Sequence, residues 1–488
     1  TSLSRYNHSK YYSPSRQYYV PNAYQGVVGR LTYEYASRYL AEFNMGYNGT
    51  ENFAKGKRFG FFPAVSLGWV ISEEKFFPKN NVVKYLKVRG SYGAVGNDQI
   101  GGDRFLYLPS SYGAASDSGV NKYNFGLASN PYTSLMIVEN KIGNPDLTWE
   151  KAKKMNVGVD INLFNNCLTA SFDIFKEKRN NILANRSTSP MIIGANLPAY
   201  NFGEMENRGW EMDLNFRHHI QDFHYWARFN YSFARNEIIY MDEVQKRYDY
   251  QMTTGRRKNQ FFGLIFDGYY NSWEEINALD RPKSSWSGNQ LQPGDVKYID
   301  VNQDGVIDDY DMVPIGYTPV PEIIYGFSFG AQYKGFDFSI LFQGADNVSI
   351  KYFGRSMWPF AKGEESAKSL IKERWTQERY EAGEKITFPR LSLNPNGETD
   401  HNYRPSTLWI RDASYLRLKN LEVGYTFTGG FVKRLNLNSV RLYFNGSNLF
   451  TWTDVVDLDP EAPSRSGNVE INTYPLQKVY NIGLNINF

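Results

Sequence analysis

The 488-residue chain carries 54 Lys and Arg against 51 Asp and Glu, a net charge of +3, so bulk charge gives no reason to expect a nucleic-acid partner. Aromatic residues make up 16% of the chain, the mean hydropathy is −0.53, and no run approaches the ~18 apolar residues of a membrane helix. Any contact with a membrane must therefore be made by strands whose other face is polar.

Two further features concern disulfide bonds and processing. The single cysteine, Cys167, excludes an internal disulfide. The chain begins at Thr1 with neither an initiator Met nor the apolar stretch of a signal peptide, which predicts a processed or truncated start.

Alternation of apolar and polar residues predicts antiparallel hairpins from the first part of the chain onwards. Residues 27–35 and 39–47 alternate on either side of 36–38, so these two strands are predicted neighbours joined by a short turn. Three more tight turns of this kind are predicted, at 165–166, 219–222 and 334–335. The phase of the alternation slips once, near Lys419 and Asn420, which predicts a β-bulge there.

Long connections separate these tight turns. They span roughly 97–148, 179–204, 237–320, 347–407 and 450–475. Short turns at one end of the strands and long loops at the other are typical of outer-membrane barrels, in which the long loops are extracellular. Because such loops far exceed what a hairpin needs, we expect them to fold over one another, close the mouth or hold another protein, and of these we favour holding another protein.

The last strand, at 480–488, has the strongest alternation. It places Tyr480, Ile482, Leu484, Ile486 and Phe488 on one face, with small or polar residues on the other. About nine to eleven tilted residues are enough to cross a bilayer core. The pattern favours a strand between lipid and water, although an edge strand of a soluble β-sandwich alternates in the same way.

About thirteen strands are predicted, and their directions predict an incomplete barrel. If the last strand descends to a periplasmic terminus, the first must descend as well, towards the short turn at 36–38. Bacterial single-chain barrels have an even number of strands and start in the periplasm. An odd set would leave an unpaired edge in lipid, so we expect further strands upstream or in another polypeptide. The predicted strands begin near 26, 39, 59, 85, 149, 167, 205, 223, 322, 336, 413, 439 and 476.

Blocks of recognisable sequence occur along nearly the whole chain. Near the carboxy terminus they are 412–425 (DASYLRLKNLEVGY), 444–452 (FNGSNLFTW) and 459–461 (DPE). The other blocks are 62–69 (FPAVSLGW), 86–93 (LKVRGSYG) with 96–97 (GN), 144–150 (NPDLTWE), 373–375 (ERW) and 474–476 (YPL). In this order the blocks resemble the SusC/RagA family of TonB-dependent transporters.

The resemblance implies an all-β fold, a transmembrane antiparallel β-barrel in the bacterial outer membrane, with residues 1–488 as its carboxy-terminal part. Family members have a 22-strand barrel around an amino-terminal plug, so about thirteen strands would leave nine missing. No plug-like segment and no TonB-box candidate is recognisable in the sequence. Inward-facing Arg417, Lys419, Arg441, Tyr443 and Asn445 would line the lumen or meet the plug.

The implied function is TonB-dependent import of a bulky nutrient, an oligosaccharide or a peptide. The TonB complex would act through the missing plug, and a SusD-like surface lipoprotein would form a lid. Tyr480 and Phe488 resemble the terminal aromatic signal for barrel assembly. The alternatives are a non-transporting outer-membrane barrel for adhesion or secretion, and a soluble carbohydrate-binding β-sandwich. The substrate and the residues that bind it are not predicted.

The strongest chemical motif is a calcium-type loop within an extracellular segment at 295–320. Oxygen donors recur at positions 1, 3, 5, 9 and 12, Gly305 stands at the turn position, and five carboxylates crowd into the loop. Position 12 is Asp rather than Glu, and no EF-hand helices flank the loop, so a structural, dockerin-type Ca²⁺ site is predicted, with an acidic solvated turn as the alternative. The predicted ligands are Asp300, Asn302, Asp304, Val306 (backbone carbonyl), Asp308 and Asp311.

Catalytic motifs are missing from the sequence. It contains no H-E-x-x-H, G-x-S-x-G or G-x-x-x-x-G-K-[ST] pattern, so no enzymatic activity is expected. Adjacent His218 and His219 would point to opposite faces of a strand and cannot chelate one ion together, which favours a polar turn. The five histidines are His8, His218, His219, His224 and His401. Loop tryptophans (Trp273, Trp286, Trp358 and Trp375) could stack on a ligand, although packing between loops is the favoured interpretation.

Overall fold

A computed structural model of the chain describes most of its length. His8 and the segment around 470–475, including the start of the 474–476 block, lie outside the described residues. The described residues are 2–7, 22–99, 105–108, 113–114, 122–125, 132–135, 137–138, 142–188, 197–286, 291–352, 358–360, 369–392, 400–456, 458–461, 468–469 and 476–488.

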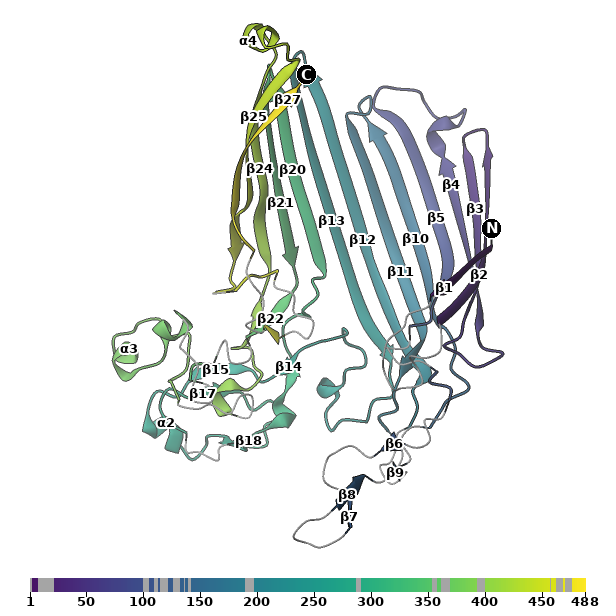
Figure 1. The fold of residues 1–488 in the computed structure, drawn as a ribbon. Helices are drawn as coiled ribbons and strands as arrows, with labels where there is room; N and C mark the ends of the chain where they lie inside the picture. The colour runs from purple at the N-terminus through teal and green to yellow at the C-terminus, as the bar shows by residue number, and fades with distance from the viewer. Residues whose placement is uncertain are drawn as a thin grey trace.

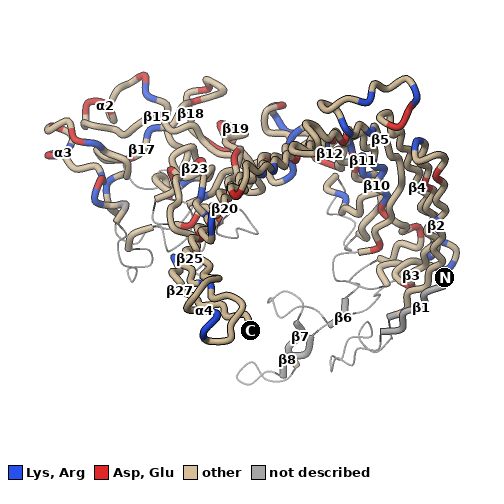
Figure 2. The backbone as a smooth tube through the Cα atoms, turned by 90° about the horizontal axis from the view of Figure 1, so that it is seen from above, with Lys and Arg blue, Asp and Glu red and all other residues tan. Residues whose placement is uncertain are grey.

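One antiparallel sheet of fourteen strands forms a tall curved wall (Figure 1). From above, the wall curves around an open interior, and its end strands, β1 (Ser2–Asn7) and β27 (Val479–Asn487), do not pair with each other in the described structure (Figure 2). The strands between them are β2 (Asn22–Tyr35), β3 (Tyr39–Thr50), β4 (Phe59–Val70), β5 (Val83–Asn97), β10 (Glu150–Leu163), β11 (Leu168–Ala184), β12 (Tyr200–Ile220), β13 (Phe223–Tyr240), β20 (Ile323–Tyr333), β21 (Phe336–Asp346), β24 (Tyr415–Phe427) and β25 (Ser439–Thr453).

All thirteen predicted wall strands are present, but the predicted number is one short. The missed strand, β1, is only six residues long, lacks apolar alternation, and pairs with β2 from Ser2↔Val27 to Asn7↔Asn22. The sheet therefore has an even number of strands, and the odd strand number from which an incomplete barrel was inferred is wrong. The open sheet itself, with two unpaired edges among the described strands, remains a reason to expect further strands.

The predicted tight turns lie together at one end of the wall. Ala36 and Ser37 have φ angles of 52° and 56°, and Lys334 and Gly335 have φ angles of 45° and 92°. Two consecutive positive φ angles define the type I′ turn, whose twist suits a two-residue hairpin. Two connections at this end are longer and contain the short helices η1 (Ile71–Glu73) and α4 (Gly430–Arg434). The long connections are at the other end (Figure 1).

The two faces of the wall differ in polarity. On β12, Trp210 and Met212 alternate with Glu211 and Asp213, and the register with β11 and β13 keeps each set on its own side. On β27, the side chains from Tyr480 to Phe488 that were predicted to share one face are all exposed. The apolar face is the outer one, and we call the polar face, towards the interior, the luminal face. Among the described residues, no helix has the length and apolar character needed to cross a membrane.

The outer face becomes charged towards the long-loop end. On β11, apolar Ile174 is followed on the same face by Lys176 and Lys178. Their ammonium groups lie 2.9 Å from a Glu206 carboxylate oxygen and 3.0 Å from one of Glu204. Charged groups in contact with lipid tails are costly, so the apolar band ends before Lys176 and the strands continue into water beyond it.

The predicted β-bulge is confirmed. The register of β24 on both β21 and β25 shifts between Leu418 and Asn420, which leaves Lys419 as the extra residue. On β25 the shift is accompanied by Asn448, whose φ angle is +54°. The bulge bends this edge of the wall near its long-loop end.

Parts of three long connections fold together into one body, the loop domain, made of the described residues within 241–322, 347–414 and 454–469 (Figure 1, lower left). Its helices are η3 (Asp249–Gln251), α2 (Trp273–Asn277), η4 (Asp309–Asp311), η6 (Ser369–Glu373), α3 (Gln377–Glu381) and η8 (His401–Tyr403). Its strands pair as β14 (Phe262–Gly263) with β19 (Val313–Pro314), β15 (Phe266–Tyr269) with β17 (Val296–Tyr298), β16 (Lys283–Ser284) with β18 (Val306–Ile307), and β22 (Ser349–Tyr352) with β23 (Ile410–Asp412) and β26 (Asn468–Val469). The connection between β5 and β10 holds β6 (Gly113–Ala114), β7 (Lys122–Phe125), β8 (Tyr132–Leu135) and β9 (Ile137–Val138).

The loop domain has its own hydrophobic core, to which each of the three connections contributes. Val296 and Trp409 are 0% and 2% exposed, and Val455 reaches the same core from the third connection. A buried polar group is built in as well, because Asp295 accepts hydrogen bonds from a terminal nitrogen of Arg390 and from the Asn402 amide. Of the three alternatives for the long loops, folding over one another describes these three connections, and holding another protein, the favoured alternative, stays a prediction.

Candidate functional site

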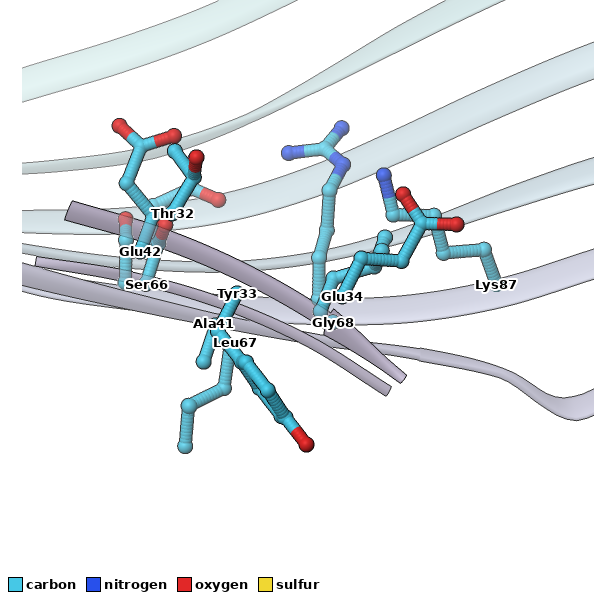
Figure 3. Close-up of a pocket in the computed structure, with 14 residues that line it drawn as sticks. Thr32, Tyr33, Glu34, Ala41, Glu42, Ser66, Leu67, Gly68 and Lys87 are labelled. Atoms are coloured by element: carbon cyan, nitrogen blue, oxygen red, sulfur yellow. The ribbon is translucent and has the colours of Figure 1, made fainter. Parts of the chain in front are cut away.

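The luminal face carries most of the polar side chains that could meet a solute. At β2 to β5 it forms a hollow of about 530 Å³ that is lined by Glu34, Glu42 and Lys87. Figure 3 shows these three side chains on one side of the strands, with Tyr33 and Leu67 on the other. The strand alternation therefore separates a charged inner surface from an apolar outer one.

An ion cluster adjoins this hollow. Arg89 on β5 donates to Asp160 on β10 at 3.0 Å and to Asp173 on β11 at 2.6 Å. Ser171 donates to the same Asp160 carboxylate at 2.8 Å. One guanidinium thus joins three neighbouring strands, and Lys87, the cross-strand partner of Asp160, balances the second carboxylate.

Two further arginines form clusters near the carboxy-terminal edge. Arg441 on β25 donates to Asp337 on β21 and to Glu422 on β24, the latter at 2.6 Å. Arg417 on β24 is only 2% exposed and is paired with Asp459 and Glu461, two carboxylates of the loop domain. The prediction that Arg417 and Arg441 face inwards is confirmed, and Arg417 also ties a loop to the wall.

The calcium-type loop has its predicted position in the loop domain, between β17 and β19. Asp300 and Asp304 accept hydrogen bonds from the amides of Gly305 and Val306, at 2.8 Å and 3.0 Å. Asp311 is fully buried and accepts three loop amides, while Asp308 caps η4. Gly305 has a φ angle of +80°, as a tight cation loop requires.

Some of the oxygen donors of this loop are arranged as a hard cation such as Ca²⁺ would require. One carboxylate oxygen of Asp300 (Oδ1) is buried without a hydrogen-bond partner, and burial raises the pKa of Asp311, which lies beside the negative charge of Asp300. A cation would relieve both. However, among the described residues no group of three or more His, Cys, Asp or Glu side chains is arranged to hold a metal ion. Calcium binding therefore stays a prediction.

The histidines of the β12–β13 hairpin do not share one site. His218 and His219 lie on opposite faces, as predicted; His218 faces outwards, 3.4 Å from Cys167 Sγ. His219 is directly opposite His224 across the strands, an arrangement that the sequence-based interpretation overlooked.

His401 lies inside the loop domain. Its Nε2 donates to the Val296 carbonyl at 2.8 Å, so its Nδ1 accepts from Ser284 Oγ at 3.0 Å in the neutral form. Burial lowers the pKa of His401, which keeps the ring neutral near pH 7. The Ser–His contact therefore joins two segments of the loop domain in a structural role.

Most loop tryptophans pack between loops, as favoured from the sequence. Trp358 and Trp375 are each 8% exposed within the loop-domain core, and the Trp286 ring lies 4.1 Å from the Arg404 guanidinium carbon. Trp273 is 51% exposed at the start of α2. Trp273 is thus the one of the four that is open to a ligand.

Several site residues had no recognisable signal in the sequence. Arg89 is 71 residues from Asp160 and 84 from Asp173, so only the register of β5, β10 and β11 brings them together. The Glu322 carboxylate likewise accepts hydrogen bonds from Arg235 and Arg257, which are 87 and 65 residues away in the sequence. Such contacts need the sheet order, which alternation alone does not supply.

Comparison with known proteins assigns the family. The family model described as TonB dependent receptor-like, beta-barrel, matches residues 2–449. The chain belongs to this family of TonB-dependent receptors. Like its family, it is an outer-membrane protein with a β-barrel fold. The predicted fold class, the outer-membrane location and the resemblance to SusC and RagA are thereby confirmed.

Individual TonB-dependent receptors agree with this assignment. The chain is 29% identical to TonB-dependent receptor P3 of Formosa agariphila and 28% identical to TonB-dependent receptor SusC of Bacteroides thetaiotaomicron, covering 95% and 96% of itself. It shares the fold of the RagAB peptide transporter structure at a TM-score of 0.71 and 24% identity, over 96% of the chain and 48% of that structure's chain. It spans only 45% and 44% of the two curated relatives, about half their length.

Proposed function

We propose that the protein containing this chain imports a bulky nutrient, an oligosaccharide or a peptide, across the outer membrane. The TonB complex would supply energy through a plug, and a SusD-like lipoprotein would form a lid over the loop domain. The observation that carries the proposal is the membership of the TonB-dependent receptor family, together with a wall that has a polar luminal face and a folded loop domain at its long-loop end. No enzymatic step is proposed for this chain.

The substrate class rests on the relatives. One similar structure is described as a peptide transporter, which favours a peptide, while the exposed Trp273 offers a surface on which a sugar ring could stack. The alternative of an adhesion or secretion barrel shares the wall but does not need TonB.

The lid and the transport proposal can be tested on the full-length protein in its native host. From mild detergent with millimolar calcium, we expect a lipid-anchored, SusD-like protein to copurify at one copy per barrel. Cells lacking the gene should lose uptake of either labelled oligopeptides or labelled oligosaccharides. An intact barrel without a stoichiometric lipoprotein would refute the lid. Surface binding of the polymer with unchanged uptake after deletion would favour adhesion.

Calcium binding is proposed as a second, structural property of the loop domain. Asp300, Asn302, Asp304, Asp308 and the Val306 carbonyl would hold the ion, and Asp311 would complete or support the set. A bound Ca²⁺ would neutralise the crowded carboxylates and fix the segment 295–320. External calcium sites bind with Kd near 10⁻⁴–10⁻³ M, so ~2 mM calcium would stabilise the loop by roughly 0.6–1.8 kcal/mol.

The calcium proposal predicts a selective effect of two substitutions. In the full-length protein, Asp300→Ala with Asp304→Ala should abolish the protection from proteolysis that calcium gives to 295–320, while the barrel stays intact. Asp309→Ala is the matched control, because its carboxylate belongs to the same acidic cluster but is 74% exposed and faces Arg404 at 3.7 Å. Equal loss of protection in the control, or no calcium at the wild-type loop by anomalous scattering, would contradict the site.

A further inference from the structure

The short-turn end of the wall carries a pair of imidazoles on the luminal face. His219 on β12 and His224 on β13 are direct cross-strand partners, two residues from either side of the turn at Gln221 and Asp222. Their ring centres lie 5.5 Å apart, with the planes inclined by 25°. Both side chains are exposed, and within the described residues no hydrogen bond holds either ring.

This spacing fits chelation of one metal ion. Directly opposite residues on antiparallel strands have Cβ atoms about 4.5–5.5 Å apart, so the two side chains leave the sheet side by side. Two imidazole nitrogens, each about 2.0–2.1 Å from a shared ion, place the ring centres roughly 5 Å apart. Small rotations about the side-chain bonds of two exposed rings are enough to close the remaining distance.

The neighbouring strand extends the row of donors. Gln332 on β20 is the direct cross-strand partner of His224 and shares its face of the sheet. Its amide oxygen offers a weaker, third donor beside the two nitrogens. Imidazole is a preferred ligand of Zn²⁺, Cu²⁺ and Ni²⁺, whereas Ca²⁺ prefers oxygen, so this pair selects a different class of ion from the loop at 300–311.

We propose that His219 and His224 form a bidentate site for one transition-metal ion, Zn²⁺, Cu²⁺ or Ni²⁺, on the luminal face at the short-turn end of the wall. The site is independent of the loop domain, because β12 (Tyr200–Ile220) runs the height of the wall between them. Ion binding would clamp the β12–β13 hairpin where it faces the interior.

The structure provides a matched control for the test. His218 is the neighbour of His219 in sequence but lies on the other face, beside Cys167 and 5.7 Å from the Tyr225 ring. The substitution His218→Ala therefore removes an imidazole from the same hairpin without touching the pair. All three histidines are exposed, so the variants are expected to fold, and heat-modifiable migration of the full-length protein checks this.

Titration of the full-length protein with Zn²⁺ against a chromogenic chelator measures the site. We expect His219→Ala and His224→Ala each to weaken one equivalent of Zn²⁺ binding by at least tenfold. The double variant should bind no more tightly than either single variant, and His218→Ala should keep wild-type affinity. With Cu²⁺, electron paramagnetic resonance should show coupling to two nitrogens in the wild type and to one in each single variant. Unchanged affinity in the single variants, or an equal loss in His218→Ala, would overturn the proposal.

Discussion

Replacing Arg417 with Ala is expected to destabilise the attachment of the loop domain to the wall by about 3–5 kcal/mol, the cost of breaking a buried ion pair by removing one partner. The Arg417 side chain is 2% exposed, and its guanidinium donates to Asp459 at 2.7 Å and to Glu461. It also donates to Thr451 Oγ1 at 2.9 Å. Without it, two carboxylates would remain close together with little access to water.

The measurement is hydrogen exchange or limited proteolysis of residues 454–461 in the purified full-length protein. Lys419→Ala is the control, because Lys419 reaches the same Glu461 at 3.3 Å but is 30% exposed, and such pairs contribute less than about 1 kcal/mol. Arg417→Lys keeps the charge but cannot bind two carboxylates in a fork, so it should fall between the two. Equal protection of 454–461 in Arg417→Ala and Lys419→Ala would show that this network does not hold the loop.

The segment held by Arg417 links the loop domain to the wall. Val455 and Leu458 pack on the loop-domain core, so residues 454–461 connect that core to the edge of the wall at β24 and β25. The β-bulge at Lys419 lies two residues from Arg417 on the same strand. A lid protein that docks on the loop domain would be held to the barrel partly through this connection, in addition to the chain's own links to β13, β20, β21 and β24.

Local patterns were enough to predict the wall. Strand alternation located every wall strand except β1, and turn residues such as Asn165 and Asn166, with φ angles of 56° and 67°, located the hairpins, because both features depend on a few neighbouring residues. The slip in phase at Lys419 predicted the bulge for the same reason. The strand β1 escaped because six residues without apolar alternation carry no periodic signal.

Contacts between distant segments could not be predicted in this way. The core that joins Val296 to Trp409 depends on how two connections pack, and neither connection has a regular period. The pair His219 and His224 is different, since both lie two residues from the predicted turn and strand pairing alone places them opposite each other. The sequence-based interpretation compared only the adjacent pair His218 and His219 and therefore missed this cross-strand pair.

Glu322 offers the second large effect, because it joins the loop domain to the centre of the wall. Its side chain is 4% exposed and accepts from Arg235 of β13 at 2.8 Å and from Arg257 of the loop domain. Asn347, which follows β21, donates to the same carboxylate at 3.2 Å. Glu322→Gln removes the charge at nearly constant shape and should cost about 2 kcal/mol, typical of hydrogen bonds to charged groups.

The matched control is Glu237→Gln on β13. Glu237 and its partner Arg208 are 43% and 63% exposed and 4.0 Å apart, so little loss is expected from this substitution. Hydrogen exchange of residues 253–260 and 317–322 in the full-length protein reports the difference. Equal exchange in the two variants would contradict a role for Glu322 as a clamp.

Acid should reproduce the effect of Glu322→Gln in the wild type. Burial alone would raise the pKa of Glu322, but hydrogen bonds from Arg235 and Arg257 outweigh it and hold the pKa below its usual range. A carboxyl whose pKa is lower when folded contributes its full stability above the unfolded pKa, about 4.3 for Glu, and loses it as the pH falls through the folded value. At pH 5 the clamp should therefore be intact. Near pH 3 we expect hydrogen exchange at residues 253–260 of the wild type to rise towards the exchange seen in Glu322→Gln. After correction for intrinsic exchange rates, the exchange of the Glu322→Gln variant itself should change less between pH 5 and pH 3. A wild-type clamp that opens already between pH 7 and 5, with Glu322→Gln following the same curve, would assign the acid sensitivity to another group.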